Sequence, residues 1–115
     1  MAGIEEENAD FLYLLAYLYM QQAKYNLALP LFRILRLHTA TSNIKIALAL
    51  ASCLHKAKYF DEALKVMDSI DEVSLGQEQK IAFFYIKSKI LWDLKQVEAS
   101  RDMLHKYLKL RNLNA

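Results

Sequence analysis

The segment Tyr25-Asn26-Leu27-Ala28 has two counterparts later in the chain. Phe60-Asp61-Glu62-Ala63 follows at a spacing of 35 residues, and Gln96-Val97-Glu98-Ala99 follows at a further 36 residues. All three segments end in alanine. A period of this length is typical of stacked helix pairs, in which a small residue on the second helix lets it cross close to the first. The spacing therefore predicts three helix pairs.

The composition agrees with a wholly helical chain. Of the 115 residues, 55% are hydrophobic, while glycine and proline together contribute only three. These are too few turn-forming residues for a sandwich, a barrel or an α/β fold. We expect one all-α domain over residues 1–115, with helices near residues 8–22, 26–37, 43–56, 60–71, 76–93 and 96–110.

The period is close to the nominal 34 residues of the tetratricopeptide repeat (TPR). We place the repeats at about residues 9–42, 44–74 and 76–111. The first two have apolar or small residues at the positions where the paired helices meet. The third is degenerate in this register, because Lys87 stands at a usually small position and Gln96 at a usually aromatic one. Three such pairs predict a short right-handed superhelix with a concave groove.

The first helix of each pair lines that groove, and its residues there are mostly apolar or aromatic. Residues 11–20 are apolar around the whole helix, whereas one core-facing helix needs only one apolar stripe. We therefore expect the groove to hold an apolar helical segment of another polypeptide. The alternative is a groove closed by the chain itself or by a symmetric dimer. The predicted lining consists of Tyr13, Leu14, Tyr17, Met20, Leu48, Ser52, Phe84, Tyr85 and Trp92.

Other functional classes receive little support from the sequence. The 15 basic and 13 acidic residues are dispersed, which argues against nucleic-acid binding. Cys53 is the single cysteine, the three histidines form no zinc spacing, and there is no glycine-rich phosphate loop. We therefore predict no catalytic residue, no metal and no cofactor. The acidic start of the chain and its short apolar runs predict a cytoplasmic protein that does not insert into membranes.

Particular stretches suggest a family. Residues 11–21, followed by Ala28 and residues 31–36, resemble the first repeat of small TPR chaperones of bacterial type III secretion. The closer likeness is to the YscY type. Three later stretches resemble the end of the proteins of that family. They are Ser88-Lys89-Ile90-Leu91-Trp92-Asp93-Leu94, Glu98-Ala99-Ser100-Arg101 and Tyr107-Leu108-Lys109-Leu110-Arg111.

The resemblance implies a cytosolic chaperone that binds a small secreted component, called X in that family. Such a chaperone keeps its partner soluble and brings it to the export gate protein at the inner membrane. A chaperone of the needle subunit and a homo-oligomeric TPR adaptor are the alternatives. A further alternative is an adaptor that reads the carboxylate end of a peptide through Lys45, Lys56 and Lys87, although the chain lacks the Asn and Arg pattern of such a clamp.

Overall fold

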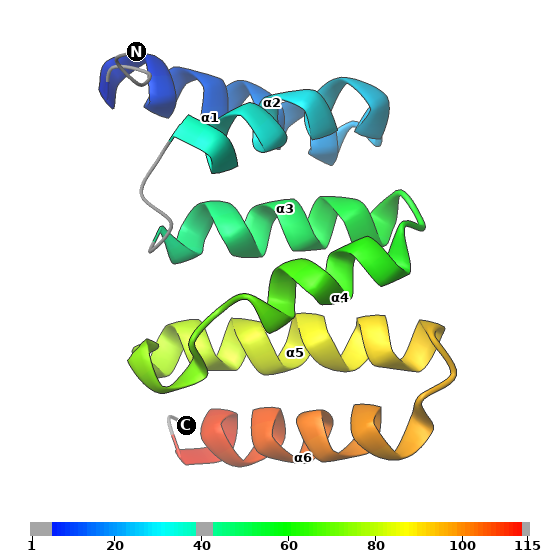
Figure 1. The fold of residues 1–115 in the computed structure, drawn as a ribbon. Helices are drawn as coiled ribbons and strands as arrows, with labels where there is room; N and C mark the ends of the chain where they lie inside the picture. Colours follow the sequence, from blue (N-terminus) through cyan, green and yellow to red (C-terminus); the bar gives the residue numbers. More distant parts are fainter. Residues whose placement is uncertain (1–5, 39–42, 114–115) are drawn as a thin grey trace.

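Three antiparallel helix pairs are stacked along one axis in the computed structural model, which describes residues 6–38 and 43–113 (Figure 1). These residues contain no β-strand, so the predicted all-α class and TPR-like superhelix are confirmed. None of their helices is both long and apolar enough to cross a bilayer. The elements are α1 (Glu6–Gln21), α2 (Tyr25–His38), α3 (Ile44–Lys56), α4 (Phe60–Asp68), the 3-10 turn η1 (Glu72–Ser74), α5 (Gln77–Asp93) and α6 (Val97–Leu113).

The turn inside each pair is built in the same way three times. Ala23, Lys58 and Lys95 adopt φ angles of 59°, 70° and 67°, a left-handed conformation that ends the first helix. The amide after each of them donates to a carbonyl five residues earlier, as from Lys24 to Tyr19 at 2.8 Å. A residue other than glycine adopts this conformation at a cost of roughly 1 kcal/mol. These turns therefore mark equivalent positions in the three pairs.

Counting from the turns corrects the register of the third pair. The turn residues are 35 and then 37 residues apart, so the partner of Ala28 and Ala63 is Ser100 and not Ala99. Ser100 is buried, and its hydroxyl donates to the backbone oxygen of Ser88 at 2.7 Å, whereas Ala99 is only partly buried. The small residue at the crossing of α5 and α6 is therefore a serine.

The same shift corrects the view that the third repeat is degenerate. Ser88, and not Lys87, is equivalent to the buried small residues Ala16 and Ala51. Val97, and not Gln96, stands at the position of the aromatic residues Tyr25 and Phe60. All three pairs therefore follow one pattern.

Apolar packing between the pairs holds the stack together. Phe32 and Leu35 on α2, Leu54 on α3, Met67 on α4 and Ile90 on α5 are all fully buried. Ion pairs add links at the surface, for example between Arg33 on α2 and Glu62 on α4. The hydrogen bond from Arg33 lowers the pKa of Glu62. Because both side chains are nearly half exposed, such a pair contributes at most about 1 kcal/mol.

The corrected register predicts unequal effects of two neighbouring substitutions. Ser100→Leu places a large side chain at the close crossing of α5 and α6, and we expect it to lower the free energy of unfolding by about 1–3 kcal/mol. Ala99→Leu, at a partly exposed site, should change it by less than about 1 kcal/mol. Urea unfolding followed by circular dichroism measures both. A larger loss in Ala99→Leu would contradict the register.

Candidate functional site

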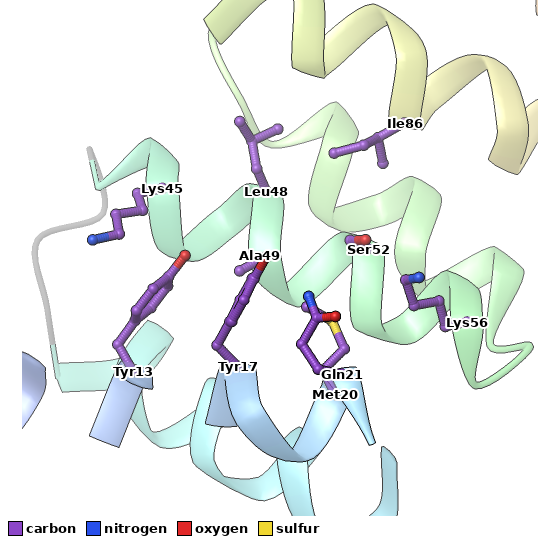
Figure 2. Close-up of a pocket in the computed structure, with 10 residues that line it drawn as sticks. All are labelled: Tyr13, Tyr17, Met20, Gln21, Lys45, Leu48, Ala49, Ser52, Lys56 and Ile86. Atoms are coloured by element: carbon purple, nitrogen blue, oxygen red, sulfur yellow. The ribbon is translucent and has the colours of Figure 1, made fainter. Parts of the chain in front are cut away.

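An open cleft of about 410 Å³ lies between α1 and α3, with α5 at its far side (Figure 2). Its volume falls within the range of roughly 300–1,000 Å³ that is usual for binding sites. The lining residues are Tyr13, Tyr17, Met20 and Gln21 from α1, Lys45, Leu48, Ala49, Ser52 and Lys56 from α3, and Ile86 from α5.

Helical periodicity directs these side chains to one place. Tyr13 and Tyr17 are one turn apart on α1, so they share a face of that helix. On α3, Leu48 and Ser52 are also one turn apart. The two faces meet because α3 packs against the first pair. Figure 2 shows both tyrosines extending from α1 toward α3.

Two stacked tyrosines form the wall of the cleft on α1. The ring centroids of Tyr13 and Tyr17 are 6.3 Å apart, and the ring planes differ by 19°. Tyr13 also meets the edge of the buried Phe32 ring at 6.1 Å, which anchors the wall on the core. Burial, and to a lesser extent Tyr17, raises the pKa of Tyr13. A tyrosine hydroxyl is protonated at neutral pH even without this shift, so it can donate a hydrogen bond to a bound chain.

The cleft carries positive charge at its two ends. Lys45 lies at one end and Lys56 at the other (Figure 2). The Lys45 ammonium is 4.3 Å from the ring centroid of Tyr13. None of the lining residues, all in the described part of the chain, carries a carboxylate. The site therefore suits an apolar segment that has acidic groups near its ends.

Five of the nine residues predicted to line the groove come together in this cleft. They are Tyr13, Tyr17, Met20, Leu48 and Ser52. Leu14, also predicted, does not line it and is 56% exposed on another face of α1. The first two pairs were placed correctly by the alanine spacing, because their true spacing is the 35 residues used.

The three residues predicted from α5 lie elsewhere. Phe84 is buried, with its ring at 5.5 Å from that of Phe83. Tyr85 and Trp92 line a separate pocket of about 260 Å³ between α5 and α6. The one-residue shift of register accounts for Phe84, which is equivalent to Leu12 and Ala47. Tyr85 and Trp92 are equivalent to Tyr13 and Met20, and they lie one pair further along the stack. The correct register brings Ile86 to the cleft, and its equivalence to Ala49 was hidden by the choice of Ala99 as the crossing residue.

The three lysines considered from the sequence as a carboxylate clamp do not lie together in the structure. Lys87 does not line the cleft, and its ammonium lies 3.2 Å from a carboxylate oxygen of Asp68. Lys45 and Lys56 remain in the cleft, at opposite ends. Two lysines so far apart do not converge on a single carboxylate.

Cys53 and His55 are both engaged in contacts that hold the fold together. Burial of Cys53 in the core raises the pKa of its thiol to about 11. Nε2 of His55 lies 2.6 Å from a carboxylate oxygen of Asp93, which connects α3 with α5. Within residues 6–38 and 43–113, no three His, Cys, Asp or Glu side chains gather as a group that could hold a metal ion.

A family model described as the SusR N-terminal TPR domain matches residues 33–115. The chain belongs to this family. The match starts within α2 and covers the remaining helices, so it includes the α3 and α5 sides of the cleft and leaves out the α1 side. No curated protein and no solved structure matched the chain. As a TPR domain the protein is a protein-interaction module, since TPR arrays present extended concave surfaces to other chains.

The position of Cys53 predicts a protected thiol in this TPR domain. Only the thiolate reacts with Ellman's reagent, and a pKa raised by about two units lowers its amount at pH 8 roughly a hundredfold. We expect the folded protein to react at least that much more slowly than the protein in guanidinium chloride. Fast reaction of the folded protein would contradict the burial, and Cys53→Ser provides the blank.

Proposed function

We propose that the cleft between α1 and α3 holds an apolar helical segment of another polypeptide and so keeps that polypeptide soluble. The observation that carries this proposal is the gathering of Tyr13, Tyr17, Met20 and Leu48 in one open cleft with a lysine at each end. Aromatic rings supply large contact areas and methionine adapts its shape, as in other helix-binding grooves. In this proposal the protein binds a partner and does not catalyse a reaction.

The two lysines limit the chemistry of the partner. Lys45 and Lys56 are separated by eleven residues on α3, which corresponds to about 16 Å along the helix. A helix bound alongside α3 would therefore carry acidic residues about three turns apart, with apolar residues between them. Such charge pairs set the orientation of the partner and its association rate more than its affinity.

The biological context comes from the resemblance to type III secretion chaperones. The stretch that carries it, residues 11–21, forms the α1 wall of the cleft. On this basis the partner is a small secreted protein of the X type, which the chaperone brings to the export gate protein from the cytoplasm. The needle subunit is the second candidate partner of the same cleft.

Coexpression with an X-type protein encoded beside the chain tests the proposal. Tyr17→Asp puts a charge in the apolar wall, and we expect it to weaken binding at least about thirtyfold, as the loss of an interface anchor usually does. Tyr59→Asp is the matched control, because Tyr59 is exposed and lies outside the cleft. Trp92→Asp should also leave binding intact. The readout is the amount of partner that copurifies, with the helical spectrum unchanged.

Equal copurification with Tyr17→Asp and with Tyr59→Asp would contradict the site. If the needle subunit copurifies in place of the X-type protein, and Tyr17→Asp abolishes this, the cleft is supported and the partner is reassigned.

The charges at the two ends give a separate prediction. Lys45→Glu combined with Lys56→Glu should weaken binding and reverse its salt dependence, because attraction to an acidic partner becomes repulsion. Affinity measured by calorimetry at low and high salt checks this. The matched control is Lys65→Glu with Lys80→Glu, outside the cleft.

A partner ending in an amide should bind as well as the free acid, and a strong preference for the acid would favour the carboxylate-reading adaptor.

A further inference from the structure

The two ends of the stack expose surfaces that the inner helices bury. Counted from the turns, Phe11, Leu14 and Leu18 on α1 are equivalent to Ile46, Ala49 and Cys53 on α3. The α3 residues are buried where this helix packs against the preceding pair. Their α1 equivalents are not covered by the other described helices, and each is about half exposed or more. They form an apolar stripe, which we call the leading face.

The opposite end has the matching surface. Trp92 on α5 is 60% exposed, while its equivalent in the first pair, Met20, is 7% exposed under α3. Leu104 on α6 is 40% exposed, while its equivalents Phe32 and Met67 are fully buried. Trp92 and Leu104 line the pocket between α5 and α6, which we call the trailing pocket. A capping repeat usually has a polar outer face, whereas this face of the third pair carries aromatic and apolar residues.

The charges of the two ends are opposite. The sequence of α1 has three acidic residues and no Lys or Arg, whereas α6 has four Lys and Arg against two acidic residues. At the trailing pocket, the Lys89 ammonium lies 4.7 Å from the ring centroid of Tyr85. The Lys106 ammonium lies 5.5 Å from that of Phe84. An acidic apolar helix therefore matches this pocket, and α1 has that composition.

We propose that the leading face of a second copy of this chain docks in the trailing pocket, repeating the junction by which α3 packs on the first pair. The register specifies the contacts. Asp10 is equivalent to Lys45, whose ammonium lies over the Tyr13 ring, and Tyr13 is equivalent to Tyr85. Asp10 of the second copy is thereby placed next to Tyr85 and the ammonium of Lys89. The contact is head-to-tail, so it extends into a chain of copies or closes into a ring.

Two variants blocked at one end each test the head-to-tail contact. Leu14→Asp disables the leading face and Leu104→Asp disables the trailing pocket, and both sites are exposed, so the fold should be kept. Sedimentation velocity of the full chain from the micromolar to the millimolar range should show the sedimentation coefficient rising with concentration. Each variant alone should remain a monomer. An equal mixture of the two should form a one-to-one dimer, because each supplies the end that the other lacks.

Three results would overturn this proposal: a wild-type chain that is monomeric throughout, a mixture that stays monomeric, or a dimer that persists in either variant alone. The last would indicate a symmetric contact. None of them affects the cleft between α1 and α3, since neither Leu14 nor Leu104 lines it.

A charge exchange tests the register of the contact. Lys89→Glu should weaken association about fivefold, the usual scale of an exposed ion pair. Adding Asp10→Lys to the same chain should restore it, since each junction then carries the same two opposite charges with their places exchanged. Lys80→Glu, outside the trailing pocket, is the control and should have no effect. If Asp10→Lys weakens association further, the proposed register is overturned.

Discussion

The close crossing of the two helices within each pair determines the rest of the structure. A small residue on the second helix makes it possible, Ala28 and Ala63 in the first two pairs and Ser100 in the third. In the third pair the serine hydroxyl also donates to the backbone of the facing helix at Ser88. Close crossing turns the same face of each first helix toward the next pair. The cleft between α1 and α3 is a consequence of that repeated geometry.

Much of this could be predicted from the sequence, and the limit has a physical cause. The alanine spacing placed the first two pairs, and with them Tyr13, Tyr17, Met20, Leu48 and Ser52 of the cleft. It failed in the third pair because serine and alanine both suit a close crossing, and Ala99 preceded Ser100. The third pair follows the second after 37 residues, two more than separate the first two pairs. These two additional residues lie between Ile70 and Phe83, where the chain forms η1. No pattern of apolar residues revealed that insertion.

Two kinds of apolar surface remain on the molecule, and they differ in whether a neighbouring helix pair packs beside them. The cleft combines residues of different pairs and carries a lysine at each end, which suits a foreign segment. The leading face and the trailing pocket are the unused halves of junctions that the chain already makes internally. Trp92 illustrates the distinction, since it stands at the position of Met20, which lines the cleft and is covered by α3, whereas Trp92 is 60% exposed. Apolar exposure alone would have merged these surfaces into one.

The most direct test of the central claim is photo-crosslinking from within the cleft. A benzophenone amino acid in place of Tyr17, in the chain coexpressed with its partner, should form adducts that map to one apolar segment flanked by acidic residues. The same group in place of the exposed Tyr59 should form few adducts with that partner. Adducts that are equally strong from both positions, or that join Tyr17 only to another copy of the chain, would contradict the claim that the cleft binds another polypeptide.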